Sequence, residues 1–452
     1  MSHLLKRKKS FAPGASQMVV LGFLVIIVLG AFLLHLPAAS SDGQPKPFLP
    51  CLFTATSAAC VTGLSVFDVG LGLTFFGKAV LLVLIQLGGL GFMTVAAVFS
   101  LFLKRNFSLR EKNTIVQTLN LSDYTGMRRL LKHILLGTLI FESAGALILF
   151  FRFLPRFGVA GALFRGVFTS VSAFCNAGFD INGLEPFGSF LPYAGDPVVC
   201  LVLSFLILAG GIGFFVWEDL YTARSLKKLS LFSKIVLFAN LVLILSGTVL
   251  FYLSERSNPQ TIGDLSFGQQ ALRSFFQAVT YRTAGFSTVD FSKIEDSTAV
   301  LSCVYMFIGG SSGSTAGGIK VTTAALLFFA FRSVISGRGQ IVVLGSKIPV
   351  QTVLKAFTLC VIGIAVTVVC SVFICHTEAV SFVSAFFECV SAFGTVGLTM
   401  GLTPGLSGLS LCILIVLMFF GRLGILTITY VVFVRKPAEE ILEYPEADVT
   451  IG

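Results

Sequence analysis

The chain has little charge: only 12% of its 452 residues are Asp, Glu, Lys or Arg, whereas 55% are hydrophobic. Soluble globular proteins usually carry about 25% charged residues. This shortage excludes an ordinary water-soluble domain and indicates that a lipid bilayer surrounds most of the chain. The net charge of +10 does not indicate a nucleic-acid partner, because the basic residues lie between apolar runs.

The sequence also lacks the motifs of enzymes and metal sites. Its ten cysteines form no CxxC pair, and most lie in apolar segments, where cysteine behaves as a small hydrophobe. The four histidines form no HExxH motif or triad-like pattern. We therefore expect no disulfide framework, no catalytic set and no organic cofactor on this chain.

One stretch, residues 313–320, approximates a phosphate-binding loop. Ile319 separates the last glycine from Lys320, and no soluble βαβ pattern surrounds the stretch. The Lys of a phosphate-binding loop follows its glycine directly and opens a helix after a strand. We therefore interpret this stretch in another way, below.

Eight apolar segments are long enough to span a bilayer, which requires about 20 helical residues. They lie near residues 18–36, 74–103, 130–151, 197–222, 232–254, 299–331, 352–375 and 408–434. Four shorter apolar stretches are candidates for re-entrant segments; they lie near residues 48–60, 160–174, 268–281 and 380–393. The basic run before the first span suggests a signal peptide, but a signal h-region has only about 7–15 residues. We expect a retained first helix instead.

The basic residues predict the orientation. Most Lys and Arg fall in segments on one side of an eight-span topology, and these segments are the N-terminus, 104–132, 224–234, 332–355 and the tail. The positive-inside rule makes this side cytoplasmic. Both termini are then cytoplasmic, and the four short stretches enter the bacterial plasma membrane from outside.

Each short stretch ends in a related phrase in which a glycine follows a phenylalanine by ten positions. The pairs are Phe53 and Gly63, Phe168 and Gly178, Phe275 and Gly285, and Phe387 and Gly397. Self-similarity at a nearly fixed period indicates a repeat architecture. A duplication that builds only a scaffold is the alternative.

The sequence thus predicts an all-α polytopic membrane protein of four tandem helix–pore-loop–helix repeats, with eight transmembrane helices and four re-entrant pore helices. The repeats cover 18–103, 130–222, 232–331 and 352–434, between cytoplasmic segments 1–17 and 435–452. Because each repeat has two spans, all four share one orientation. A pseudo-fourfold axis along the membrane normal therefore relates them.

The ends of these four repeated motifs, around their glycines, are the predicted ion-binding site, and we call them the tips. Glycine at each tip permits positive φ, so that backbone carbonyls turn toward the common axis and replace the hydration shell of a cation. The absence of carboxylates from the tips favours a large monovalent cation over a divalent one. The predicted filter residues are Cys60, Val61, Thr62, Gly63, Asn176, Ala177, Gly178, Thr283, Ala284, Gly285, Thr395, Val396 and Gly397.

The sixth span is longer than a bilayer requires, and its middle is rich in glycine. Each glycine costs about 1 kcal/mol of helix stability relative to alanine. We expect a loop that breaks this helix beneath the filter and can block conduction; a static kink that aids packing is the alternative. The predicted gate residues in this stretch are Gly309, Gly310, Gly313, Ser314, Gly317, Gly318 and Lys320.

Arg422 lies within the last span, where the aligned phrases have Gly89, Gly211 and Gly310. A charge at this depth is costly against lipid and should face a wet interior. Our hypothesis is that Arg422 projects into the pore beside the 309–318 loop as a gate residue. The alternative is an arginine satisfied by buried carbonyls away from the pore.

Three aspartates follow the tips at short spacing: Asp68, Asp180 and Asp290. Carboxylates at a pore mouth raise the local cation concentration. Aspartate also caps turns and helices, so an outer-vestibule role and a capping role both stay open. Glu142 and Glu388 lie in apolar segments without an assigned partner.

These phrases resemble the Trk/Ktr/HKT superfamily of potassium transporters over nearly the whole chain, most of all the Ktr-type membrane subunit. The matching phrases are Val61–Leu64, Gln86–Phe92, 309–318, Ser391–Gly397 and Gly421–Gly424. The resemblance implies a homodimer with one K⁺ pore per protomer, gated under the control of a cytoplasmic ring of nucleotide-binding, RCK-type subunits. It also implies Na⁺-stimulated uptake.

Three points stay open in this interpretation. Many relatives have Thr where Cys60 stands, which puts ion affinity or sodium dependence in doubt. An alternating-access cation transporter is the second candidate, although its usual signature is inverted repeats with broken helices in both halves. Whether Na⁺ is transported or only activates is not decided by the sequence.

Overall fold

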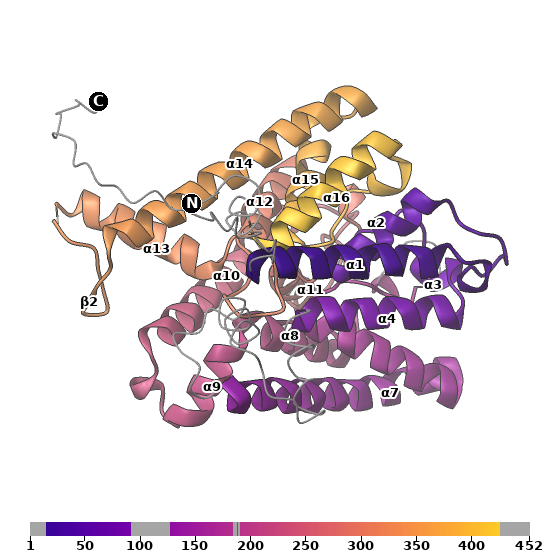
Figure 1. The fold of residues 1–452 in the computed structure, drawn as a ribbon, viewed down its shortest axis with the longest axis horizontal. Coiled ribbons are helices and arrows are strands. Elements are labelled where there is room, and N and C mark those ends of the chain that lie inside the picture. Colours follow the sequence, from indigo (N-terminus) through magenta and orange to yellow (C-terminus); the bar gives the residue numbers. More distant parts are fainter. Residues whose placement is uncertain (1–14, 92–126, 184–187, 189, 338, 425–452) are drawn as a thin grey trace, which may run out of the picture.

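The computed structural model describes residues 15–91, 127–183, 188, 190–337 and 339–424, and these are predominantly helical (Figure 1). The α-helices are α1 (Ala15–His35), α2 (Phe48–Ala59), α3 (Val69–Gly72), α4 (Phe75–Leu90), α7 (Met127–Phe174), α8 (Pro197–Ile212), α9 (Phe214–Ala223), α10 (Leu231–Glu255), α11 (Phe267–Thr280), α12 (Asp296–Phe307), α13 (Val321–Ile335), α14 (Val350–Glu378), α15 (Phe382–Gly394) and α16 (Gly408–Leu423). Five 3₁₀ turns are Pro37–Ala39, Leu191–Tyr193, Leu226–Lys228, Phe291–Lys293 and Thr403–Gly405. The strands β1 (Val342–Val343) and β2 (Ser346–Lys347) pair as an antiparallel hairpin.

Among the described residues, four helical segments are long and apolar enough to cross a membrane by themselves: Gln17–His35, Leu130–Phe174, Leu231–Glu255 and Val350–Glu378. The pair α8 and α9 passes the same test together, although it bends by 91°. The sequence predicts two separate segments near 130–151 and 160–174, whereas α7 covers both. Gly158 divides α7, because its φ of 66° and ψ of 177° are not helical.

The second helix of three repeats ends at a glycine in the left-handed region. Gly91, Gly213 and Gly424 have φ values of 80°, 94° and 83°, which a side chain would strain. The chain therefore turns at Gly213 from α8 into α9. The predicted segment 435–452 lies outside the described residues, as do most of the basic 104–132 segment and residues 1–14, 92–103 and 425–434 of the predicted segments 1–17, 74–103 and 408–434.

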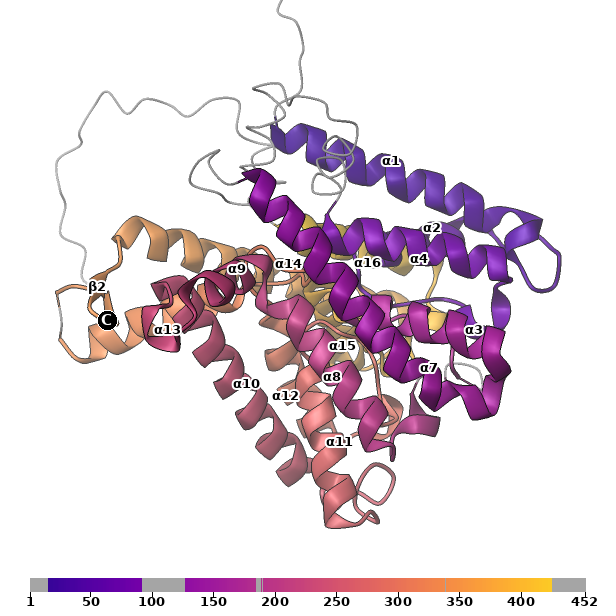
Figure 2. The ribbon, with the colours of Figure 1, turned by 90° about the horizontal axis from the view of Figure 1, so that it is seen from below.

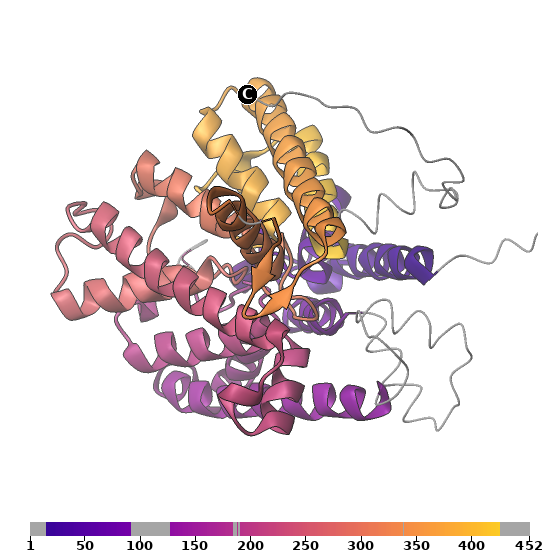
Figure 3. The ribbon, with the colours of Figure 1, turned by 90° about the vertical axis from the view of Figure 1, so that its left-hand side faces the viewer.

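The repeats follow one another around a common centre. Figure 3 shows the helices in sequence order around the molecule, from indigo through magenta and salmon to yellow. Within the first repeat, α1 packs along α2 and α4 (Figures 1 and 2). Between repeats, the second helix of each packs on the helix that contains the short segment of the next; the pairs are α4 with α7, α8 with α11, α12 with α15, and α16 with α2. The last pair closes the circle.

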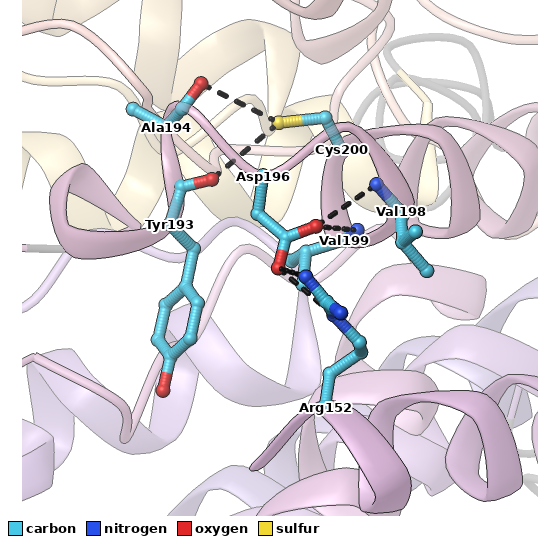
Figure 4. A network of polar contacts seen from close by, with 7 residues as sticks. All are labelled: Arg152, Tyr193, Ala194, Asp196, Val198, Val199 and Cys200. Atoms are coloured by element: carbon cyan, nitrogen blue, oxygen red, sulfur yellow. Dashed lines mark hydrogen bonds and ion pairs between the residues drawn. The ribbon is translucent and has the colours of Figure 1, made fainter. Parts of the chain in front are cut away.

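Arg152 fastens α7 to α8. Its Nε and Nη2 donate to Asp196 Oδ2 at 3.0 and 2.5 Å, while Asp196 Oδ1 accepts from the amides of Val198 and Val199 (Figure 4). Asp196 is thus the N-cap of α8, and one carboxylate satisfies both the helix end and the guanidinium. This contact joins the two helices at one exposed point.

Candidate functional site

The four tips share one backbone conformation. The residue two positions before each tip glycine has positive φ although it is not glycine, and the tip glycine has positive φ as well. The non-glycine values are 51° at Val61, 57° at Asn176, 66° at Thr283 and 51° at Thr395; the glycine values are 97° at Gly63, 69° at Gly178, 76° at Gly285 and 92° at Gly397. Non-glycine residues with positive φ are uncommon and often mark functional sites. Because the same pair of positive φ values occurs at equivalent positions in all four tips, the four tips are copies of one structural motif.

The tips also touch one another in a closed ring. Each tip glycine lies against the carbonyl oxygen of the residue before the next tip's glycine. A Cβ added at Gly63, Gly178 or Gly285 would stand 2.7, 2.7 and 2.5 Å from the carbonyl oxygens of Ala177, Ala284 and Val396, and one at Gly397 would overlap that of Thr62. The four predicted filter segments therefore meet at one centre, in chain order.

Serines in the short helices hold three of the tips. The amides of Thr62, Ala177 and Val396 each donate to the carbonyl of the serine five residues earlier, at 2.8 Å. The side chains of Ser57 and Ser391 also accept from the amides of Gly63 and Gly397, at 3.0 and 3.1 Å. The third repeat lacks this serine, and Thr280 Oγ1 donates instead to the carbonyl of Phe286 at 2.6 Å.

The predicted filter residues beside the ring are buried. Cys60 forms the C-cap of α2 and is fully buried. Asn176 Nδ2 donates to the carbonyl of Arg282 at 3.0 Å and to Thr283 Oγ1 at 3.3 Å, which ties the second tip to the third. The buried oxygens Asn176 Oδ1, Thr62 Oγ1 and Thr395 Oγ1 have no partner among the described residues. Polar atoms in this state are rare in proteins unless water or an ion satisfies them.

The segment between α12 and α13 is a non-helical loop with a closed neck. The amide of Gly309 donates to the carbonyl of Ile319 at 2.7 Å, and the amide of Val321 donates to that of Gly310 at 2.9 Å. The chain thus leaves and returns at the same point. We refer to residues 309–318 as the intramembrane loop and to the paired residues 308–310 and 319–321 as its neck.

Backbone bonds fix the intramembrane loop against two other repeats. The amide of Ser311 donates to the carbonyl of Gly211 at 3.0 Å, and the amide of Phe214 donates to that of Gly313 at 2.9 Å. On the other side, the amide of Gly318 donates to the carbonyl of Gly421 at 3.2 Å. The loop therefore bridges α8 and α16.

The loop also lies against the bases of the tips. Thr315 Oγ1 donates to the carbonyl of Phe174 at 3.1 Å, just before the second tip. A Cβ at Gly317 would overlap the side chain of Thr395, and one at Gly318 would stand 3.2 Å from the carbonyl oxygen of Gly394. Glycine is required at 317 because no side chain fits between the loop and the fourth tip.

Two partly buried cations contact the loop through its carbonyls. Arg422 Nη1 donates to the carbonyl of Thr315, and its Nη2 donates to those of Gly88 and Gly89, the latter at 2.9 Å. Lys320 Nζ donates to the carbonyl of Ala316 at 2.8 Å. Arg422 is thus satisfied by carbonyls, as in the alternative prediction, but one of those carbonyls belongs to the loop.

A hollow of about 410 Å³ is lined by all four tip glycines together with Asp68, Asp180 and Asp290, the residues predicted for the outer vestibule. Asp68 Oδ1 accepts from the amide of Leu71 at 2.7 Å and caps α3, and Asp290 Oδ1 accepts from the amide of Ser292 at 3.0 Å. Asp180 Oδ2, by contrast, is buried without a hydrogen-bond partner among the described residues. Asp180 Oδ1 accepts from the amide of Asn182 at 2.6 Å, so all three aspartates cap local backbone, while their vestibule role stays a prediction.

A family model for TrkH, described as a cation transport protein, matches residues 5–444. The chain belongs to the TrkH family. Its members are cation transport proteins, not enzymes.

Named relatives of this TrkH-family chain align along its whole length. It is 39% identical over 436 residues to the Ktr system potassium uptake protein B of Bacillus subtilis (strain 168), covering 96% of both chains. It is 36% identical to the potassium/sodium uptake protein NtpJ of Enterococcus hirae, covering both chains fully. The crystal structure of the potassium transporter TrkH from Vibrio parahaemolyticus matches with a TM-score of 0.73 at 22% identity, covering 94% of this chain and 86% of that one. This last likeness is one of fold.

Two buried charged residues of this TrkH-family site received no role from the sequence. Glu388 Oε1 accepts from Thr399 Oγ1 and from the amide of Met400 at 3.2 Å, and its Oε2 accepts from Thr403 Oγ1 at 2.7 Å, so it holds the chain after the fourth tip. Arg282 is 2% exposed and stands where the other phrases have Cys or Gly. A charge in an otherwise apolar tip phrase was the available signal for Arg282.

Proposed function

We propose that this chain is the membrane subunit of a bacterial potassium uptake system, with the ring of four tips as its selectivity filter. One observation carries the proposal: the tips meet in a closed circle of glycines and carbonyl oxygens. Carbonyl rings that replace the hydration shell are how potassium filters work. The relatives named as potassium uptake proteins support the choice of ion.

The proposed architecture has eight transmembrane helices and four re-entrant pore helices, with a pseudo-fourfold axis through the ring. The circular packing of each second helix on the next short helix supports it. Under this proposal the repeats cover 18–103, 130–222, 232–331 and 352–434. Both termini are cytoplasmic because the basic segments lie on their side of the membrane.

The gate in this proposal is the intramembrane loop. It lies against the inner ends of the second and fourth tips, and Arg422 and Lys320 hold its carbonyls. An ion that has passed the ring meets this loop and the positive charge beside it. Displacement of the loop would open the path, while the aspartates of the outer hollow concentrate cations before the ring.

The proposed assembly is a homodimer with one pore per protomer, controlled by a cytoplasmic ring of nucleotide-binding, RCK-type subunits. The resemblance to Ktr-type membrane subunits supports both partners. Sodium stimulation of uptake is part of the same proposal, and the potassium/sodium uptake name of the E. hirae relative supports it.

The test is growth of a bacterium that lacks its own potassium uptake systems, at low external K⁺. We expect the wild-type chain to restore growth and Gly63→Ser and Gly285→Ser to fail. Gly43→Ser is the matched control, because Gly43 also has positive φ, 69°, but has no neighbouring atom within 4 Å of an added Cβ. Equal growth of all four at matched expression would reject the filter assignment. Titration of Na⁺ in the same assay tests stimulation.

A further inference from the structure

Arg282 connects the third tip to the neck of the intramembrane loop. It directly precedes Thr283, the residue with positive φ in that tip. Its Nη1 donates to the carbonyl of Ile308 at 2.6 Å, and its Nη2 donates to that of Gly309 at 2.6 Å. A single planar guanidinium thus bridges two consecutive carbonyls of the neck, a fork that lysine cannot reproduce.

The guanidinium is buried without a carboxylate. No ion pair to Arg282 occurs within the described ranges, where its remaining acceptor is Asn240 Oδ1 at 3.0 Å. The two neck carbonyls lie at the C-cap of α12, Ile308, and at the residue after it. Removing the partners of a buried charge is strongly destabilising. Any motion that carried the carbonyls of 308 and 309 away from Arg282 would therefore be costly.

The third repeat differs from the others at this place. In the other three, a glycine of the second helix packs so closely on the carbonyl preceding the tip that no Cβ fits; the pairs are Gly88 on Ala59, Gly210 on Phe174 and Gly421 on Phe393. The equivalent Gly309 packs instead on Gly317 of the loop itself. In the other three repeats, direct backbone packing joins the second helix to the tip. In the third repeat, the hydrogen bonds of Arg282 make this connection.

Asn240 gives this contact an independent support. It lies in α10, is 6% exposed, and its Nδ2 donates to the carbonyl of Val236 at 2.8 Å, which orients Oδ1 toward Arg282. Arg282 therefore joins three elements at once: the third tip, the neck of the loop and α10. None of these contacts involves the part of the loop beyond Gly310, which Arg422 contacts at the carbonyl of Thr315.

We propose that Arg282 is a positioning residue that fixes the third tip of the filter and the neck of the gate relative to each other and to α10. Opening then leaves residues 308 and 309 in place and moves only the loop beyond Gly310. This inference rests on the proposed function. It assigns different roles to the two arginines: loss of Arg282 disturbs gate and filter together, whereas loss of Arg422 releases the gate and leaves the filter intact.

The experiment measures K⁺ and Na⁺ flux through the purified full chain in liposomes, without regulatory subunits. We expect Arg282→Gln to raise K⁺ flux and to lower the K⁺/Na⁺ flux ratio, each by about 2- to 30-fold, the range of coupling changes. Arg422→Gln should raise K⁺ flux by a similar factor and keep the ratio within about twofold of wild type. Arg282→Lys, which keeps the charge but not the fork, should lie between wild type and Arg282→Gln in both quantities.

Asn240→Ala is a second variant that tests the same inference, because it removes one hydrogen-bond acceptor of Arg282 and leaves Arg282 itself in place. It should shift flux and ratio in the same directions as Arg282→Gln, by smaller factors, and it decides the outcome if Arg282→Gln is not recovered from the membrane. An unchanged K⁺/Na⁺ ratio in the recovered variants overturns the inference. A wild-type chain that conducts K⁺ no better than Na⁺ overturns the proposed function instead, so the two failures are distinguishable.

Discussion

Gly178 and Gly285 face each other so closely that a Cβ on either one would meet the backbone of the other. An added Cβ would stand 2.9 Å from Gly285 Cα in the first case and 3.0 Å from Gly178 Cα in the second. Both glycines also have positive φ. The requirement for glycine at these tips is therefore steric as well as conformational.

Replacement of Gly178 tests this steric requirement. Gly178→Ala would push its Cβ against the carbonyl of Ala284 and widen the ring, so we expect a large loss of K⁺ uptake and weaker discrimination against Na⁺. Uptake of K⁺ in competition with Na⁺ is the measurement. Gly43→Ala imposes the same conformational strain in open space and should retain wild-type uptake. Equal uptake by both variants would contradict the steric argument.

Removal of the Arg422 side chain should open the gate. Arg422→Ala removes the bonds that join Thr315 of the loop to Gly88 and Gly89 of the first repeat, together with a positive charge beside the path. We expect K⁺ flux without regulatory subunits to rise by about 2- to 30-fold. Arg152→Ala is the matched control, because Arg152 is 46% exposed and pairs with Asp196 away from the loop. Lower or unchanged flux in Arg422→Ala would exclude a gating role.

Loss of Glu388 should destabilise the fourth tip. Glu388→Ala leaves the hydroxyls of Thr399 and Thr403 and the amide of Met400 without their buried acceptor, at about 1–3 kcal/mol for each abandoned donor. We expect a lower melting temperature of the detergent-solubilised protein. Glu378→Ala is the control: Glu378 also accepts three hydrogen bonds, but toward the exposed surface, where water can replace it. Equal shifts in both variants would show that burial is not the cause.

Asp180 should concentrate cations at the outer hollow. Asp180→Asn removes a charge that lines it, so we expect the KM for K⁺ to rise about twofold, the effect of one unit charge roughly 8 Å from the ion in water. The difference should shrink as an impermeant salt is added, because salt screens the charge. Asp219→Asn, on α9 and not among the lining residues, should leave KM unchanged. A salt-independent difference would argue for a structural effect.

The period of the tip phrases predicts where the ring forms, because each tip depends on a local pattern of glycine and apolar residues. Breaks in the second helices are also visible locally, as glycine clusters at 88–91, 210–213 and 421–424. The 91° bend at Gly213 is not predictable in the same way, because the hydrogen bond from Phe214 to Gly313 fixes it across about a hundred residues of chain.

The partners of the buried charges were the hardest to predict. Arg282 finds Asn240 and the carbonyl of Gly309 only after α10, α11 and α12 have packed, and backbone carbonyls leave no mark in a sequence. The third repeat also shifts its buried face by one residue. Phe275, which matches Phe53, Phe168 and Phe387 in the repeated motif, is only partly buried, while Phe276 is fully buried. Periodicity predicts which elements exist, whereas tertiary packing selects the side chain that fills each space.

In the part of the chain that the structure describes, the intramembrane loop occurs in the third repeat alone, and this has a consequence for how such a pore can evolve. Four identical chains around one axis would have to carry four identical plugs, and these would collide where a single one fits. Fusion of the repeats into one polypeptide removes that symmetry requirement. One repeat can then carry the proposed gate, while the other three supply the residues against which it packs.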